Sequence, residues 1–146
     1  MKARDFARVV DHEKVVAAIR AAEARSTGEL RVHVAHLEID DAHRAAIAKF
    51  EALKMTTTRE RNGVLIFIAP RSRKFAVIGD TAIHARCGDE LWREMAAAMS
   101  QDFRAGRFTE GIVKGLARAG DLLAQHFPRP EGRPDANELG DEVTED

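Results

Sequence analysis

The segment from Gly63 to Asp80 constrains the fold more than any other part of this chain. It reads GVLIFIAPRSRKFAVIGD, with two apolar runs on either side of a basic turn. The first run, residues 64–68, does not alternate with polar residues, which is typical of a central strand covered on both faces. Because only a few residues separate it from the second run, residues 74–78, we expect these two strands to pair antiparallel.

A further strand is indicated before this hairpin. Residues 29–36 alternate between apolar and polar side chains, with Arg31 and His33 on the polar side, as in a half-buried strand. A helix connects this strand to residues 64–68, so the two strands are expected to be parallel, with a right-handed crossover. The chain therefore predicts a small mixed α/β sheet.

Four helices are expected around this sheet, each with apolar residues at helical spacing. Asp11 and Asp41 stand at the start of the first two, where an acidic side chain can cap a helix. The third helix is expected to begin near Asp89 and to end at Gly106. Thr109 is expected to cap the fourth.

The composition indicates one domain with an acidic extension. Hydrophobic residues make up 45% of the 146 residues, which is enough for a sizeable core. Residues 129–146 have an excess of acidic side chains and almost no apolar content. We therefore expect a domain over residues 1–128 and a disordered acidic tail over residues 129–146.

Charge and cysteine content limit the partners and the compartment. The chain has 23 basic and 24 acidic residues, a balance that argues against a nucleic-acid binder. The single cysteine, Cys87, excludes an internal disulfide and fits a reducing compartment. The first residues lack the apolar stretch of a signal peptide, and the longest apolar run is too short to cross a bilayer. A cytoplasmic protein with no transmembrane segment is expected.

Three corners of the sheet are predicted to meet at one edge. With two parallel strands and a third antiparallel to them, the starts of the first two strands lie beside the end of the third. These corners contain Gly28, Gly63 and Gly79, and glycine permits a positive φ or a close approach of the backbone to a ligand. Alternatively, the three glycines only turn corners. The polar rim predicted at this edge consists of Thr27, Glu29, Thr58, Arg61, Asn62, Asp80 and His84.

Other reactive residue types have structural alternatives. Asp80 and His84 could form an acid–base pair, although a histidine that caps or packs against a short helix is the commoner arrangement. His33 and His36 are three residues apart on a strand, so they point to opposite faces and cannot easily share a metal ion. Cys87 could have a lowered pKa near a helix N-terminus, or could be a buried structural cysteine.

Several motifs, taken together and in order, resemble the TPM domain family. They are TGELRV at residues 27–32, MTTT at 55–58, RNGVLI at 61–66, IGD at 78–80 and FRAGRFTEGI at 103–112. The resemblance spans most of the chain and implies an α/β/α three-layer sandwich around the small mixed sheet. It also implies a polar site at the sheet edge, where some relatives bind calcium or show acid phosphatase activity. Other relatives act as non-enzymatic modules in the maintenance of membrane complexes.

Arg61 departs from the family pattern. Many relatives have an aspartate immediately before the Asn-Gly pair, which suits a hard cation. Because calcium needs several oxygen ligands, the arginine disfavours a Ca²⁺ or Mg²⁺ site built on Glu29, Asn62 and Asp80. The guanidinium could instead bind an anion, or pair with Glu29 or Asp80.

Three functions are compatible with these features. The preferred one is a non-catalytic binding module for a protein partner, for example at a membrane complex, because a convincing set of catalytic groups is missing. The alternative is an acid-phosphatase-like hydrolase, with or without a divalent cation, that uses the polar rim. The third is a regulatory protein whose acidic tail docks on its own basic body or on a partner.

Overall fold

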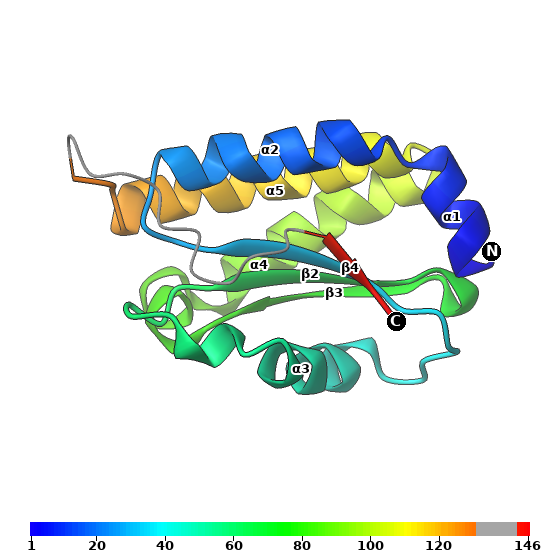
Figure 1. Cartoon of the computed structure of the whole chain (residues 1–146), viewed down its shortest axis with the longest axis horizontal. Helices are drawn as coiled ribbons and strands as arrows, with labels where there is room; N and C mark the ends of the chain where they lie inside the picture. The colour runs from blue at the N-terminus through cyan, green and yellow to red at the C-terminus, as the bar shows by residue number, and fades with distance from the viewer. Residues whose placement is uncertain (131–142) are drawn as a thin grey trace.

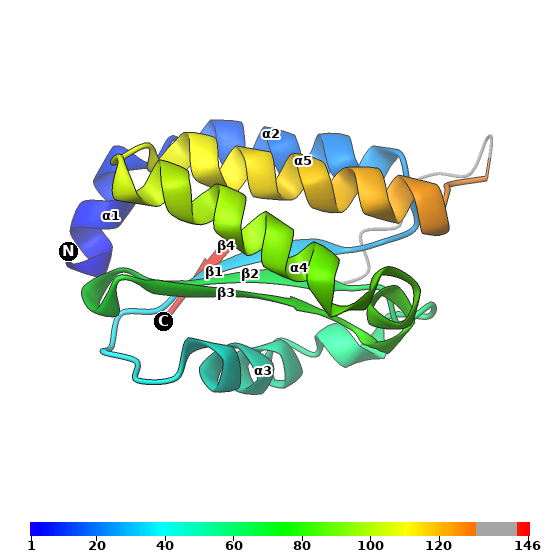
Figure 2. The same cartoon turned by 180° about the vertical axis from the view of Figure 1, so that it is seen from behind.

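Strands and helices form three layers in the computed structural model, which describes residues 1–130 and 143–146. Helices α2, α4 and α5 cover one face of the sheet and α3 covers the other (Figures 1 and 2). The α/β/α sandwich that the family resemblance implied is thereby confirmed. In chain order the elements are α1 (Ala3–Val9), α2 (His12–Ala24), β1 (Leu30–Val34), α3 (Ala42–Ala52), η1 (Met55–Thr57), β2 (Val64–Ala69), η2 (Pro70–Ser72), β3 (Lys74–Gly79), α4 (Thr81–Arg104), α5 (Phe108–His126) and β4 (Val143–Glu145).

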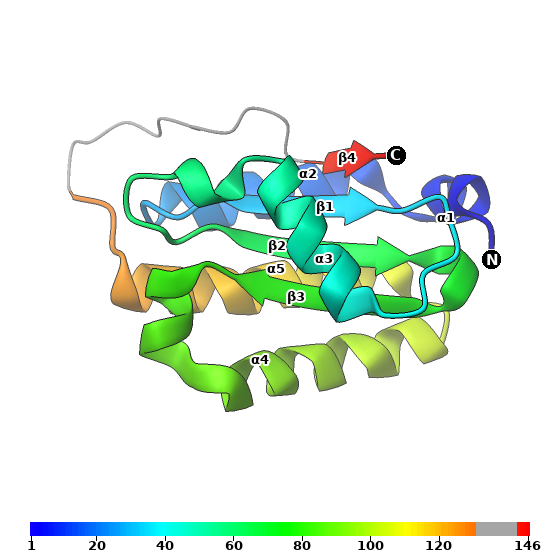
Figure 3. The ribbon, with the colours of Figure 1, turned by 90° about the horizontal axis from the view of Figure 1, so that it is seen from below.

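The sheet has the strand order β3-β2-β1-β4 (Figure 3). β1 and β2 are parallel, with Leu30 opposite Val64, and β2 and β3 are antiparallel, with Val64 opposite Gly79, as the connection lengths predicted. β4 was not predicted. Residues 143–145, in the segment expected to be disordered, instead form a strand that pairs parallel with β1. The expectation for residues 131–142 lies outside the described residues.

β1 is buried on both faces, so the expectation of a half-buried strand was wrong. Arg31 and His33 are each 2% exposed. The His33 ring stacks on Phe67 of β2, with ring centroids 5.7 Å apart. Its Nδ1 and Nε2 atoms each lie 2.7 Å from a side-chain oxygen, Thr144 Oγ1 and Asp146 Oδ1 respectively. The residues of and beside β4 therefore give a buried polar side chain the partners that water would otherwise supply.

The side chains of β2 alternate between two cores. Val64, Ile66 and Ile68 pack into the cluster shared with α2, α4 and α5. Leu65 and Phe67 pack into the cluster shared with α3. All five are at most 3% exposed, and burial of each such side chain is worth roughly 1.5–3 kcal/mol. The central, doubly covered strand predicted from the apolar run is confirmed.

Two of the expected helix caps are present and one is not. Asp11 accepts the backbone N–H of Lys14 at the start of α2, and Asp41 accepts that of Arg44 at the start of α3. Thr109 lies inside α5, whose preceding residue provides no side-chain cap. Its Oγ1 instead accepts the backbone N–H of Asp11 at 3.0 Å, which ties α5 to the start of α2. The short helix α1 was not predicted.

Helix α4 begins eight residues earlier than the expected start near Asp89. Asp80 caps it, and Gly88 interrupts it with φ 72° and ψ 175°, so that the expected helix is the part after this kink. The glycine permits the positive φ that the interruption requires. Among the described residues, no helix combines the length and the apolar character that a membrane crossing requires.

Candidate functional site

The three predicted corners lie together at one end of the sheet. The backbone N–H of Asp80 donates to Gly63 O at 2.9 Å, and the N–H of Val64 donates to Glu29 O at 2.8 Å. These bonds join the end of β3, the start of β2 and the residue before β1 (left side of Figure 3). Residues far apart in the sequence therefore share one edge, as the topology predicted.

Packing accounts for two of the corner glycines. Neither Gly28 nor Gly79 has a positive φ. A Cβ atom would lie 2.6 Å from Leu123 Cδ2 at Gly28 and 2.5 Å from Trp92 Cζ2 at Gly79, whereas at Gly63 the nearest atom would be 3.4 Å away. The first two glycines allow α5 and α4 to approach the strand ends, so they do not by themselves indicate a ligand.

Arg61 and Asp80 form a bidentate ion pair on the rim. Arg61 Nε donates to Asp80 Oδ2 at 2.9 Å, and Arg61 Nη2 donates to Asp80 Oδ1 at 3.0 Å. Oδ1 also accepts the backbone N–H of Thr81 at 2.7 Å. The hydrogen bonds with Asp80 and its negative charge raise the pKa of Arg61 above its ordinary value. Of the two acidic partners considered for Arg61, the structure selects Asp80.

This arrangement does not fit a divalent cation. Both carboxylate oxygens of Asp80 accept N–H donors, and the Asp80 side chain is only 3% exposed. Calcium takes about six to eight oxygen ligands, which the guanidinium at this position cannot supply. The part of the chain that the structure describes contains no group of three or more His, Cys, Asp or Glu residues that could hold a metal ion.

Thr27 and Asn62 form a second polar cluster on the rim, together with Glu60. Asn62 Nδ2 donates to Thr27 Oγ1 at 3.1 Å, and the Thr27 hydroxyl donates to the carboxylate of Glu60. Glu60 was missed by the sequence analysis, although an acidic residue two positions before Asn62 was an available signal. Among the described residues, the buried atoms Thr58 Oγ1 and Asn62 Oδ1 have no hydrogen-bond partner.

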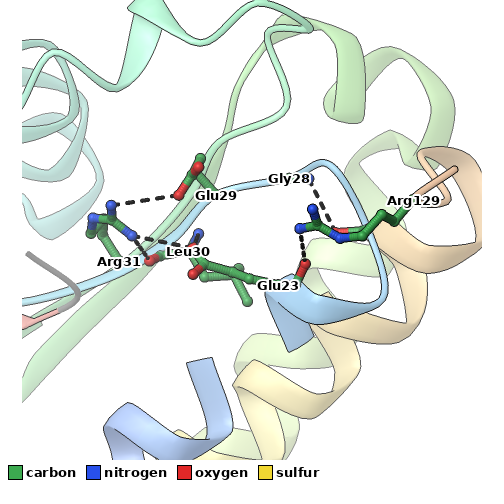
Figure 4. Close-up of polar contacts among 7 residues, drawn as sticks. Glu23, Gly28, Glu29, Leu30, Arg31 and Arg129 are labelled. Atoms are coloured by element: carbon green, nitrogen blue, oxygen red, sulfur yellow. Dashed lines mark hydrogen bonds and ion pairs between the residues drawn. The ribbon is translucent and has the colours of Figure 1, made fainter. Parts of the chain in front are cut away.

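Glu29 contacts a buried arginine behind the rim (Figure 4). Its Oε2 lies 3.5 Å from Arg31 Nη2, and Arg31 Nη1 lies 3.2 Å from Glu23 Oε2. The pKa of Glu23 is raised to about 8, mainly by burial and also by the hydrogen bond and charge of Glu29, which together outweigh the lowering by the Leu30 N–H bond and the charge of Arg31. Two carboxylates thus share one guanidinium, and the buried Glu23 carboxyl releases its proton less readily than an exposed one.

Arg129 closes the same region from the far end of the chain. It donates from Nη2 to the backbone oxygen of Glu23 at 2.6 Å and from Nε to that of Ala24 at 3.1 Å. These carbonyls belong to the last turn of α2, where a cation is favourable. The sequence analysis missed the association of Glu23, Arg31 and Arg129, because their spacing does not indicate that they meet.

The remaining candidates do not join the rim chemistry. His84 Nε2 lies 3.1 Å from Asp89 Oδ1 at an exposed position, while the Asp80 carboxylate is bonded to Arg61 and Thr81, so the acid–base pair considered for His84 is not formed. Partial burial raises the pKa of the Cys87 thiol, which disfavours the reactive thiolate.

A cavity of about 590 Å³ lies at the opposite end of the sheet, between α1, the β2–β3 turn, the end of α4 and the start of α5. It was not predicted, because its aromatic lining comes from four separate elements. The rings form a continuous series of contacts, with centroid distances of 5.1, 5.9 and 5.1 Å. In order along this series they are Phe6, Phe108, Phe103 and Phe75.

The layers and the polar edge define a small α/β/α domain with a mixed sheet, in which a cluster of polar side chains lies where the parallel strands begin. The chain belongs to the TPM domain family, whose sequence profile matches residues 4–122. The resemblance carried by the motifs is thereby confirmed.

The solved structures similar to this chain include two bacterial proteins. The BA42 protein of the psychrophilic bacterium Bizionia argentinensis, determined by NMR, is 34% identical over 94% of this chain and 95% of that one, with a TM-score of 0.83. The N-terminal domain of a protein from P. gingivalis shares the fold at 18% identity, over 84% and 83% of the two chains, with a TM-score of 0.56. No curated protein matches the chain.

Proposed function

We propose that this TPM domain is a non-catalytic binding module for a protein partner, and that the partner docks at the aromatic cavity. The observation that carries the proposal is the contrast between the two ends of the sheet. The acidic groups of the rim are bonded to other residues of the chain. The cavity, by contrast, presents apolar rings within a volume in the range of ligand-binding sites.

The hydrolase alternative has less support. A general base or a nucleophile needs a carboxylate that can reach the substrate, whereas Asp80 is buried and accepts three hydrogen bonds. His84, the nearest histidine in sequence, pairs with Asp89. A phosphatase built on these residues would first have to break the ion pair between Arg61 and Asp80.

The third hypothesis, docking of the acidic tail, gains support from the tail residues that the structure describes after residue 142. Asp146 Oδ1 lies 3.2 Å from Lys49 Nζ on α3 and 2.7 Å from His33 Nε2. These contacts lie beside β1 and give the acidic segment a structural role in our proposal. We further propose a cytoplasmic location, which the lone Cys87 supports.

Site-specific photo-crosslinking tests the proposal. A photoreactive phenylalanine analogue at Ser100, which lines the cavity, should give a discrete protein adduct in cells, whereas the same analogue at Arg44 on α3 should not. Mass spectrometry identifies the crosslinked partner. The affinity of this partner, once purified, is then measured by titration for the wild-type domain and for the Ser100→Trp variant. Phosphate release from p-nitrophenyl phosphate by the purified domain, abolished in Asp80→Ala, would contradict the proposal and favour the hydrolase.

A further inference from the structure

We infer that the partner presents an acidic, amphipathic segment, in which an apolar side chain enters the cavity and flanking Asp or Glu carboxylates bind the arginines at its mouth. This inference rests on the proposed function and specifies the chemistry of the partner. It is argued from three features of the cavity: its aromatic rings, the basic side chains that line it, and the lack of acidic partners for these side chains among the described residues.

The floor of the cavity suits an apolar anchor. Phe6 is 3% exposed and packs edge-on against Phe108, while Phe75, Phe103 and Phe108 are only partly buried. The partly buried rings keep some surface open to solvent in the cavity. An aromatic or aliphatic side chain that covered this surface would gain the burial energy that drives interface hot spots.

The mouth of the cavity is basic on two sides. Arg73 belongs to the β2–β3 turn, Lys74 is the first residue of β3, and Arg104 is the last residue of α4; all three are exposed. Among the described residues that line the cavity, none is acidic. The cavity therefore attracts an anionic ligand and repels a cationic one.

These charges are not used within the fold. In the part of the chain that the structure describes, the side chains of Arg73 and Arg104 make no ion pair and no hydrogen bond. Lys74 donates to the backbone oxygen of Asp40, a neutral acceptor, so its charge is not neutralised by that contact. By comparison, Arg61, Arg107 and Arg25 each pair with an aspartate.

The placement of the cations favours a peptide over a single-headed amphiphile. A long-chain carboxylate offers one charge at one end, whereas the basic groups that line the cavity belong to separate elements, the β2–β3 hairpin and the end of α4. An acidic segment offers carboxylates on both sides of its apolar residue. Each arginine can then bind a carboxylate bidentately.

Fluorescence anisotropy tests this inference with two labelled peptides. One has a Phe-Leu pair flanked on each side by two glutamates, and its twin has lysines in place of the glutamates. We expect the acidic peptide to bind, with an affinity that falls as salt is added, and the lysine twin to bind at least about tenfold more weakly.

Three variants complete the test. Arg73→Glu combined with Arg104→Glu should weaken the acidic peptide at least about tenfold, whereas the control pair Arg44→Glu with Arg59→Glu, exposed but away from the cavity, should change it less than about twofold. Ser100→Trp, which fills the cavity without removing a core side chain, should also abolish binding. Circular dichroism and thermal melting confirm that each variant folds.

Equal affinity for the two peptides, or unchanged binding by the charge-reversed variant, would overturn the inference. Binding to phosphatidylglycerol vesicles that depends on Arg73 and Arg104, without peptide binding, would overturn it in favour of a lipid surface. If the crosslink at Ser100 instead identifies a partner with a basic or uncharged segment, the inference fails while the binding module stands. Phosphatase activity that is lost in Asp80→Ala would contradict both the inference and the proposed function.

Discussion

At the polar end of this domain, the charged side chains of single residues pair with one another. Arg61 stands directly before the Asn62-Gly63 pair, and its guanidinium donates to both carboxylate oxygens of Asp80. A cation and a guanidinium supply the same kind of counter-charge to a buried carboxylate. Arg61 therefore supplies the counter-charge of the buried Asp80 carboxylate from within the chain.

Arg61→Asp should convert the rim into a calcium-responsive site. The variant removes the guanidinium and adds a carboxylate beside Asp80 and Asn62, so we expect Ca²⁺ to raise its melting temperature, whereas the wild type should not respond. Arg59→Asp changes the charge equally at a nearby exposed position and serves as the control. A calcium response in the wild type equal to that of Arg61→Asp would contradict this account.

Glu23→Gln should change how stability depends on pH. The pKa of Glu23 rises from 4.5 to about 8 on folding, so the native state binds more protons than the unfolded state between these values. The wild type should therefore lose stability as pH rises from about 5 to about 8, and the variant, which has no carboxyl at this position, should lose less. Urea unfolding across this range measures the difference. Glu13→Gln, at an exposed position on the same helix, should show the same dependence of unfolding free energy on pH as the wild type. If Glu23→Gln also shows the wild-type dependence, the raised pKa of Glu23 is refuted.

At the scale of elements, the hairpin is fixed by a contact between its last residue and α4. A Cβ atom at Gly79 would lie 2.5 Å from Trp92 Cζ2, so Gly79→Ala should cost about 1–3 kcal/mol through overpacking. Gly63→Ala, where the nearest atom is 3.4 Å away, should change the free energy of unfolding by less than about 0.5 kcal/mol. Urea denaturation measures the free energy of unfolding of both variants. Equal losses in the two would contradict a specific clash with Trp92.

The elements with a strong apolar pattern could be predicted, and those held by polar partners could not. β2 follows from its unbroken run, and its pairing with β1 and β3 follows from connection length. β4 could not be predicted because residues 143–145 carry little apolar surface and are held by β1 and by the neighbours of His33. The start of α4 was missed because Gly88 interrupts the helix.

The same distinction applies to the candidate sites. The rim was predicted because strand direction alone decides which corners meet, and the partnership of Arg61 was among the options that the sequence left open. The cavity was missed because its rings belong to α1, β3, α4 and α5, and nothing in their sequence spacing indicates that Phe6 lies near Phe108.

For the molecule as a whole, the sheet separates two regions with different roles. β2 and β3 run from the rim, where Asp80 pairs with Arg61 and caps α4, to the cavity, where the side chain of Arg73 has no ion pair among the described residues. In our proposal, one end stabilises the fold and the other receives a partner. The two roles can be separated experimentally because no rim residue lines the cavity.

Asp80→Ala and the pair Arg73→Glu with Arg104→Glu should therefore have opposite effects. Loss of the cap of α4 should lower the free energy of unfolding by about 0.5–2 kcal/mol and leave the affinity for the acidic peptide within about twofold of wild type. The charge-reversed pair should keep the stability and lose the peptide, because exposed side chains without ion pairs contribute little to folding. Urea unfolding and anisotropy on the same preparations measure both quantities. If Asp80→Ala weakens the peptide as much as the charge reversal does, the two ends are coupled through the hairpin, and the separation of roles is wrong.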